Sequence, residues 1–425
     1  MKKGYQITGQ KDSRELAKFL ASNGQVILPM VDLIEQSRMA VDELLEVLGR
    51  STLEAVLEIS AAGVAGESHQ GRRGGEIVRH GRQDGVVSLC NRKMRMSRPR
   101  LRKKSGGVGS EVGVPAYDVM QDDSRLSEKV WDTMMRGVST RNYAAILPDA
   151  CDAVGVSRSS VSREFVLASE EECKRLLERR FEELDILAIY IDGMSFGEHN
   201  VTAAVGVDVN GYKHVLGIAE GATENSAVAM ALLESIAERG VASGVKRLFV
   251  IDGSKALRKA IDTVYGADNP VQRCRNHKVK NVVDHLPNEL KDQAKCAMRA
   301  AFKLPEEDGM KRLETLASWF DREHPGAAAS LREGLSEMFT INRLGLPPTL
   351  RRSLGTTNII ESPNSGVRMR TRRVSRWQGG SMVLRWAASG FLATEKNFRR
   401  LMGYADLWIL AAALDRHVDQ EGLAA

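Results

Sequence analysis

Two short apolar stretches decide the fold: Leu187–Gly193 (LAIYIDG) and Leu248–Gly253 (LFVIDG). A run of β-branched and aromatic residues this short, stopped by an aspartate and a glycine, is typical of a buried strand. In open α/β sheets, ligands and metals collect at the carboxyl ends of the strands. Asp192 and Asp252 stand at two such ends. We therefore expect the two carboxylates to lie side by side and to begin a metal site.

The residues around these two stretches predict the order of a mixed sheet. Asn210-Gly211 between two β-rich runs is a strong hairpin signal, so three antiparallel strands are expected first. A β-α-β arrangement in parallel is expected to follow. The expected strands are 187–193, 201–209, 213–219, 247–253 and 271–274, and the expected helices are 223–239, 254–264 and one beginning at His277. This order predicts an α/β fold with a ribonuclease-H-like mixed sheet.

The rest of the chain is predicted to be mainly helical. An Ala- and Leu-rich stretch after Pro287 predicts an all-helical insertion with helices at 289–302, 309–320 and 327–338, and the residues from Thr356 to Leu414 are expected to return to the sheet. The expected division is 1–70 helical, 71–117 basic and partly β, 118–183 helical, 184–286 first part of the core, 287–350 insertion, and 351–425 last part of the core with C-terminal helices.

Composition favours a protein of the cytosol. Of the 425 residues, 43% are hydrophobic and 27% are charged, as in ordinary soluble proteins. No signal peptide follows Met1, and the apolar run Leu407–Leu414 is too short to span a bilayer. Five cysteines without paired spacing indicate reduced thiols. We expect a cytoplasmic, nucleoid-associated protein that does not enter membranes.

Positive charge is concentrated in two segments. Residues 72–104 hold twelve Lys/Arg against two acids, and residues 366–400 hold nine against one, although the net charge of the chain is only +6. Such segments indicate a polyanion partner, whereas a merely solvated face usually mixes both signs. The candidate DNA-binding residues in these segments are Arg98, Arg100, Arg102, Lys103, Lys104, Arg368, Arg370, Arg372, Arg373 and Arg376.

A third candidate DNA-contacting element is a helix-turn-helix. Its first helix is expected at 143–153, its turn at 154–156 and its second helix at 157–166, which exposes serines together with Arg158 and Arg163. Such groups contact phosphates and guanine edges from a major groove. A glycine-turned helix pair is also common for purely structural reasons, so this alternative stays open.

The best candidate for a third acid is Glu361, in Thr356–Ser365 (TTNIIESPNS). Phosphodiester chemistry with two metals needs carboxylates that hold two Mg²⁺ ions, and hard oxygen ligands suit Mg²⁺. Each acid alone has a plainer interpretation: strand-ending turns for the aspartates, and a capping box with Asn358 as N-cap for Glu361. Pro363 predicts either a helix beginning at that residue or a kink.

Together these motifs resemble the Mutator-like transposases of bacterial insertion sequences. The resemblance covers about residues 80 to 400 and rests on four matching pieces: Ile191–Gly193, Val250–Gly253, Gln272–Lys278 (QRCRNHK) and Thr356–Ser362 (TTNIIES). It implies a ribonuclease-H-like catalytic domain with an Asp-Asp-Glu (DDE) triad. Asp192, Asp252 and Glu361 would bind two Mg²⁺ ions, with Mn²⁺ as a substitute, and would be the catalytic residues.

The resemblance also implies an activity and partners. The protein would bind the terminal inverted repeats of its own element, cut the DNA and join the freed 3′-hydroxyl to a target strand. We expect a homodimer, because two element ends must be brought together. Two alternatives remain open: a ribonuclease-H-like nuclease without strand transfer, and a catalytically inactive DNA-binding regulator.

Four other residues have two interpretations each. The family pattern places Cys274 and His277 beside the triad, where His277 would contact DNA or the attacking water. The Cys-x-x-His spacing is also that of half a zinc site, although no second pair stands nearby, and a core role suits Cys274. Trp377 and Trp386 either stack against DNA or pack between helices.

Overall fold

The computed structural model describes residues 50–67, 75–89, 92–104, 110–121, 124–137, 158–222 and 224–416. The chain divides into two compact units: Met1–Asp123 with Asp149–Gly155, and Ser124–Pro148 with Val156–Ala425. The predicted helix at 143–153 and its turn lie outside the described residues, as do most of the residues before 50.

In the first unit, an antiparallel sheet packs against helices. The sheet has the order β1 (Ile77–Leu89), β2 (Arg92–Lys103) and β3 (Glu111–Val112). Residues 50–65 are helical, and α2 spans Pro115–Val119. Leu57, Ala61, Val87, Met96 and Leu101 form the core. The two predicted strand pieces are confirmed, but β2 continues through the charged residues beyond Met96, because alternate positions such as Leu101 point into that core.

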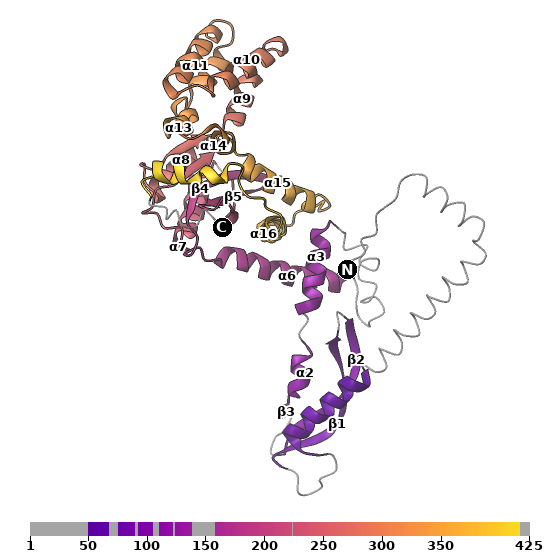
Figure 1. Ribbon diagram of the computed structural model, residues 1–425. Helices are drawn as coiled ribbons and strands as arrows, with labels where there is room; N and C mark the ends of the chain where they lie inside the picture. The colour runs from indigo at the N-terminus through magenta and orange to yellow at the C-terminus, as the bar shows by residue number, and fades with distance from the viewer. Residues whose placement is uncertain are drawn as a thin grey trace, which may run out of the picture. The chain divides into compact units, whose positions relative to one another are not determined.

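A five-stranded mixed sheet forms the centre of the second unit (Figure 1). Its strands are β4 (Ile186–Phe196), β5 (His199–Asp208), β6 (Lys213–Glu220), β7 (Leu248–Ile251) and β8 (Val271–Arg273), in the order β6-β5-β4-β7-β8. β4, β5 and β6 are antiparallel neighbours, whereas β4, β7 and β8 run parallel. The predicted meander followed by parallel strands is confirmed.

Helices cover both faces of this sheet. α7 (Ser226–Glu238) and α8 (Lys255–Val264) pack on one face, around Ile189, Ile191 and Phe249. The other face is covered by α6 (Arg158–Glu178), α15 (Asn358–Thr371), α16 (Gly380–Glu395) and α17 (Leu407–Ala413). The alternation of inward directions along β4, with Ile189 on one face and Tyr190 on the other, separates these two cores. The predicted return of the C-terminal helices to the sheet is confirmed.

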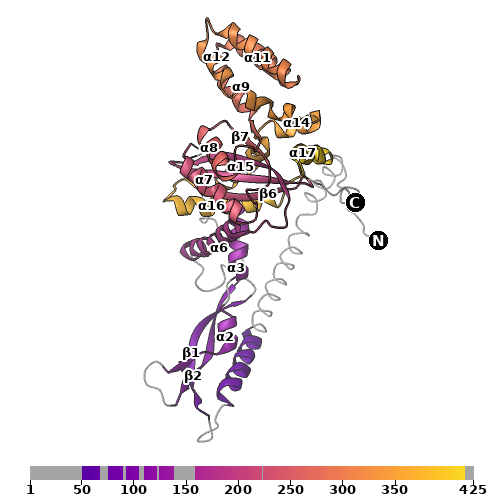
Figure 2. The same cartoon turned by 90° about the vertical axis from the view of Figure 1, so that its left-hand side faces the viewer.

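The helical insertion has its own core. It contains α9 (Arg275–Asp284), α10 (Asn288–Ala301), α11 (Glu306–Phe320), α12 (Pro325–Arg332) and the 3₁₀ turn η3 (Ser336–Phe339), followed by α13 (Thr340–Arg343) and α14 (Pro348–Leu354). α11 and α12 lie far from α3 (Ser124–Met135) and α6 within this unit (Figure 2). The predicted helix at 327–338 is wrong in its second half, because Gly334 adopts a left-handed φ of 66° and interrupts it.

The predicted second helix of the helix-turn-helix is much longer than expected. α6 continues past Val166 to Glu178, and its side chains Val161 and Phe165 are buried. The ring of Phe165 lies 4.5 Å from that of Trp386 on α16. α6 is therefore held against the catalytic unit, and only its outer positions, such as Arg163, remain exposed.

The two tryptophans pack inside the unit. Trp386 is 7% exposed, and Trp377 contacts the rings of Phe196 and Trp386. Their packing role is thus the one that the structure supports. No helix in the described ranges has both the length and the apolar character needed to cross a bilayer.

Candidate active site

Strand register brings Asp192 and Asp252 together. β4 and β7 run parallel, with Tyr190 opposite Val250 as the last pair. Two positions further along each strand stand Asp192 and Asp252, so both aspartates leave the same edge of the sheet from neighbouring strands. Asp252 follows the last residue of β7, and its Oδ1 accepts a 2.9 Å hydrogen bond from the backbone N–H of Ser254.

Glu361 reaches the same region from α15. Three of the charges that act on the pKa of Asp192 come from Asp252, Glu361 and His277, so these side chains share one environment. Glu361 stands in the first turn of α15, which begins at Asn358. The hydroxyl of Thr357 donates a 2.6 Å hydrogen bond to Glu361 Oε1. The helix thus presents the glutamate to the aspartates from its N-terminal end.

Two expectations about the start of this helix are wrong. Thr357, not Asn358, is the N-cap, and its hydroxyl bonds the Glu361 side chain instead of a backbone N–H. The helix does not begin at Pro363, which lies inside it. Glu361 N–H already bonds the Thr357 carbonyl at 2.9 Å, so the helix is established before the proline. Pro363 removes one later backbone donor and does not displace Glu361 from the helix.

Electrostatics couple the three acids. Burial raises the pKa of Asp192 to about 6, and the charges of Asp252 and Glu361 act in the same direction. The backbone N–H of Gly193 and the charge of His277 oppose them. Asn364 Nδ2 also donates a 2.8 Å hydrogen bond to Asp192 Oδ2. A carboxylate with this much unfavourable burial and like charge is the kind of group that a divalent cation stabilises.

Cys274 and His277 lie next to Glu361. One potential ligand atom from each of the three side chains lies within 4.8 Å of the others. A hydrogen bond with Cys274 raises the pKa of His277 to about 9 against the effect of burial, and the charges of Asp192 and Glu361 add to it. Burial acts to raise the pKa of Cys274, but hydrogen bonds with His277 and Thr357 outweigh it and leave that pKa below its ordinary value.

Thr357 connects these groups. Its side chain is completely buried, and its hydroxyl lies 2.6 Å from Glu361 Oε1, 3.2 Å from Cys274 Sγ and 3.3 Å from His277 Nδ1. A hydroxyl has one proton to donate, so its shortest contact, to Glu361, leaves its lone pairs for the imidazole. Thr357 therefore fixes the positions of Glu361 and His277 together.

Two residues of the site were missed from the sequence alone: Thr357 and Asn364. Both belong to the stretch Thr356–Ser365 that contains Glu361. Asn364 stands three residues after Glu361, which places both side chains on one face of the helix. That spacing was the signal for Asn364, but its partner Asp192 lies on a distant strand.

The donor set fits a hard divalent cation. Asp192, Asp252 and Glu361 offer carboxylate oxygens, the ligands that Mg²⁺ prefers. The carboxamide oxygen of Asn364 is buried without a hydrogen-bond partner beside Asp192. Cys274, His277 and Glu361 form a softer set, with three protein ligands where a structural zinc site needs four.

Most of the predicted arginines after Glu361 are exposed. Arg368, Arg372, Arg373 and Arg376 extend into solvent from the end of α15 and the residues after it. Arg370 differs from them, because burial lowers its pKa and its guanidinium donates a 3.1 Å hydrogen bond to the Gly366 carbonyl. Arg370 is thus occupied in holding its own helix.

The predicted cations of the first unit have intramolecular partners to different degrees. The guanidinium of Arg98 lies 3.9 Å from the centre of the Tyr117 ring, and Arg100 and Arg102 both pair with Glu111. Lys103 and Lys104 are exposed at the end of β2. In the second unit, Arg163 is exposed on α6, and Arg158 is the first residue of that helix.

Comparison with known proteins identifies the family. The family model described as "Transposase, Mutator family" matches residues 26–400. The transposase for insertion sequence element ISRM5 of Rhizobium meliloti (strain 1021) is 24% identical over 385 residues, which cover 88% of this chain and 93% of the relative.

Two further relatives match over shorter lengths. A probable transposase for an insertion sequence element of Corynebacterium diphtheriae is 28% identical, over 48% of this chain and 58% of the relative. The transposase for element IST2 of Acidithiobacillus ferrooxidans is 26% identical, over 47% of this chain and 65% of the relative. With the family model matching most of its length, the chain belongs to the Mutator family of transposases.

Proposed function

We propose that this protein is a DDE-type DNA transposase that cuts and joins DNA at the ends of its insertion sequence. The observation that carries the proposal is the meeting of Asp192, Asp252 and Glu361, where two acids leave adjacent parallel strands and the third arrives on a helix. Membership of the Mutator transposase family supports the same reaction. The strand order and the helical insertion support a ribonuclease-H-like catalytic core.

The three acids would hold two Mg²⁺ ions, or Mn²⁺ in their place. When bound, such ions activate the attacking oxygen and stabilise the leaving 3′-oxygen of a phosphodiester. Asn364 and Thr357 orient two of the carboxylates, and His277 places a cationic donor beside them. His277 would therefore contact the phosphate under attack or orient the nucleophile.

The overall reaction consists of two displacements at phosphorus. In the first, water attacks a phosphodiester, the bond from phosphorus to the 3′-oxygen breaks, and a free 3′-hydroxyl forms. In the second, that hydroxyl attacks a phosphodiester of the target, whose own 3′-oxygen leaves. The exposed arginines Arg368, Arg372, Arg373 and Arg376 follow the catalytic glutamate directly and would contact the DNA backbone.

Recognition of the terminal inverted repeats would involve the first unit and α6. Lys103, Lys104 and Arg163 offer exposed cations there, while Arg98, Arg100 and Arg102 have intramolecular partners that phosphates would have to replace. A homodimer would bring two element ends together. The expected test is a shift of the oligomeric state on adding DNA that carries the repeats, measured by light scattering.

The central experiment uses DNA with the element's end and a labelled target duplex, with Mg²⁺ or EDTA. Wild type is expected to cut and join with Mg²⁺ or Mn²⁺ and to be inactive in EDTA. Asp192→Asn, Asp252→Asn and Glu361→Gln should each lose at least about a thousandfold in rate, as expected when a metal ligand of a two-metal site is removed. Asp284→Asn, an exposed acid on α9, is the matched control and should behave as wild type.

The products decide between the proposal and its alternatives. Cutting without joining would indicate a nuclease. DNA binding with no chemistry in any divalent metal would indicate a regulator, against which stands the presence of all three acids. Retained activity in all three acid variants would refute the triad. Activity restored by Zn²⁺ but not by Mg²⁺ would assign the metal site to Cys274, His277 and Glu361 instead.

A further inference from the structure

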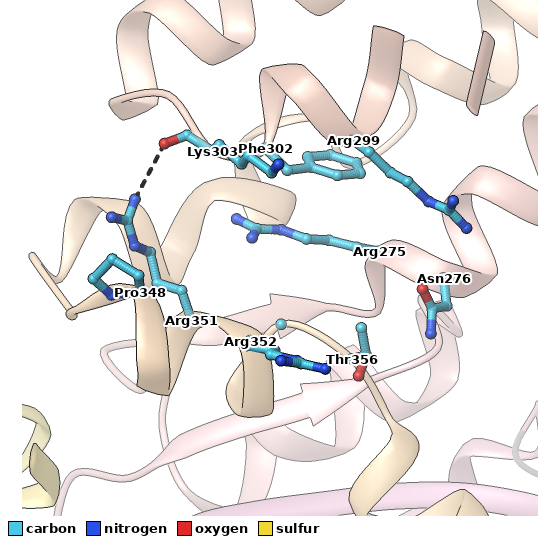
Figure 3. A pocket seen from close by; sticks show the side chains of 10 residues that line it. Arg275, Asn276, Arg299, Phe302, Lys303, Pro348, Arg351, Arg352 and Thr356 are labelled. Atoms are coloured by element: carbon cyan, nitrogen blue, oxygen red, sulfur yellow. Dashed lines mark hydrogen bonds between the residues drawn. The ribbon is translucent and has the colours of Figure 1, made fainter. Parts of the chain in front are cut away.

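A cavity of about 580 Å³ lies between the helical insertion and the sheet core. Its walls come from three elements: the start of α9, the end of α10 with the residues after it, and α14 with the residues after it. Figure 3 shows Arg275 between the side chains of the α10 region and those of the α14 region. The lining residues are Arg275, Asn276, Arg299, Phe302, Lys303, Pro348, Arg351, Arg352, Gly355 and Thr356.

The lining is strongly basic. Four arginines and one lysine line the cavity, and no acid does. None of these five side chains forms an ion pair with any residue in the described part of the chain, whereas other cations of the insertion do. Arg343 pairs with Glu306, and Arg332 pairs with Asp321. The cavity therefore concentrates positive charge that the protein itself leaves uncompensated.

Two features show that this concentration is unfavourable without an anion. Burial and the neighbouring charge of Arg351 lower the pKa of Arg275 to about 10. Two further polar atoms of the lining, Arg351 Nε and Thr356 Oγ1, are buried without a hydrogen-bond partner. Buried polar groups are normally satisfied, and each unsatisfied group costs about 1–3 kcal/mol. An anion with several acceptor oxygens would satisfy these donors and remove the repulsion.

The cavity is also adjacent to the candidate active site. Asn276 stands directly before His277, and Thr356 stands directly before Thr357. The backbone N–H of Arg275 bonds the Gly355 carbonyl at 3.0 Å, which ties the two walls together beside Cys274. A strand whose phosphate lies at the three acids would therefore continue past this cavity.

We propose that this cavity binds phosphates of the DNA strand next to the phosphodiester that is cut. Arg275 and Arg351 form its floor, and the exposed Arg299, Lys303 and Arg352 form a rim open to a long polyanion. The helical insertion would thus bind the DNA backbone on the side of the site opposite its sheet. This assignment rests on the proposed function, since it takes the occupant to be the substrate strand.

The test measures how salt weakens DNA binding. The probes are a fluorescein-labelled 20-nucleotide oligothymidylate and a duplex of about the same length, titrated with the full chain by anisotropy at several salt concentrations. The pocket variant is Arg299→Gln with Lys303→Gln, both exposed, so folding should be retained. The matched control is Lys311→Gln with Arg312→Gln, two exposed cations of α11 away from the cavity.

Each lost phosphate contact lowers the slope of log affinity against log salt by about 0.7 to 0.9. Two lost contacts mean that a fourfold rise in salt should weaken wild type about tenfold more than the pocket variant. The control should have the wild-type slope. Equal slopes for the pocket variant and the control would overturn the proposal.

Two additional measurements separate other outcomes. Binding of pyrophosphate or ATP, measured by calorimetry, that is lost in the pocket variant while its DNA slope equals wild type would assign the cavity to a small anion and overturn the strand assignment. DNA cleavage by wild type is assayed in parallel. A reduced slope with no cleavage would uphold the cavity and refute the proposed function, and cleavage with an unchanged slope would do the reverse.

Discussion

Asn364 Nδ2 donates a 2.8 Å hydrogen bond to Asp192 Oδ2 and so joins α15 to β4. The two residues are 172 positions apart in the sequence, and Asn364 is only 2% exposed. The bond fixes one oxygen of a carboxylate whose ionised form is disfavoured by burial. Asn364 therefore positions Asp192 and does not itself need to touch the substrate.

Replacing Asn364 with alanine should weaken metal use more than it weakens the fold. Loss of a group that orients a metal ligand typically costs about 10–100-fold in metal affinity or activity. We expect Asn364→Ala to need about that much more Mg²⁺ for half-maximal DNA cleavage, because Asp192 loses its fixed orientation. The measurement is the cleavage rate across a Mg²⁺ titration.

The matched control for this change is Asn269→Ala. Asn269 is a comparably buried amide whose side chain donates to the Tyr265 carbonyl at 2.6 Å, on the far side of β7 and β8 from α15. It should lower thermal stability and leave the Mg²⁺ requirement unchanged. If both variants change the Mg²⁺ requirement equally, Asn364 has no positioning role.

Asp192→Asn should stabilise the metal-free protein at neutral pH. The pKa of Asp192 in the native state is about 6, above its ordinary value of 3.8, so the native state holds this proton more tightly than the unfolded state. The favourable contribution is complete below about pH 4 and is lost as the pH rises through 6. At about 1.4 kcal/mol per pKa unit, the ionised carboxylate costs the native state up to about 3 kcal/mol at pH 7.5.

Urea unfolding in EDTA at pH 4.5 and 7.5 measures this effect. Asparagine carries no charge at either pH, so the variant should exceed wild type by about 1–3 kcal/mol at pH 7.5 and by less at pH 4.5. Asp268→Asn, an exposed acid, should show no such difference. A variant no more stable than wild type at pH 7.5 would show that the site does not strain Asp192.

Much of the sheet could be predicted, because its signals are local. Short apolar runs, the Asn210-Gly211 turn and the carboxyl ends of β4 and β7 together predict two neighbouring aspartates, as the register from Tyr190–Val250 onward has them. Helix ends were harder to predict. Gly334 is visible in the sequence, but only its left-handed backbone shows that it ends the helix before it.

What could not be predicted depends on long-range packing. The polar start of α6 indicates a short recognition helix, yet the buried Cys173 and Leu176 continue the same helix against the sheet. The bond from Asn364 to Asp192 and the cationic cavity beside Arg275 both join segments far apart in the sequence. No local pattern specifies such pairs.

Thr357→Val should disturb Glu361 and His277 together. Valine keeps the volume of threonine but removes the hydroxyl that lies 2.6 Å from Glu361 Oε1 and 3.3 Å from His277 Nδ1. We expect DNA cleavage to fall about 10–100-fold, with most of the rate restored in Thr357→Ser, which keeps the hydroxyl. The measurement is the cleavage rate at saturating Mg²⁺.

Thr340→Val serves as the control for this hydroxyl. Thr340 is 1% exposed and its hydroxyl donates to the Val271 carbonyl at 2.7 Å, outside the candidate site. It should cost stability, as a buried hydrogen bond does, without changing the rate. A rate loss in Thr340→Val as large as in Thr357→Val would reduce both effects to general destabilisation.

Gly253→Ala should destabilise the protein and displace Asp252. Gly253 has a φ of 111°, which side-chain-bearing residues rarely adopt, and an added Cβ would lie 2.0 Å from Arg273 Nε. Arg273 cannot move freely, because it is 6% exposed and its guanidinium pairs with Glu333 at 3.1 Å. Backbone strain and overpacking together predict a cost of about 2–5 kcal/mol. Gly244→Ala, where nothing lies within 4 Å of an added Cβ, should cost less than about 0.5 kcal/mol in the same urea unfolding experiment. Equal stability of the two variants would show that Arg273 does not hold the turn after Asp252.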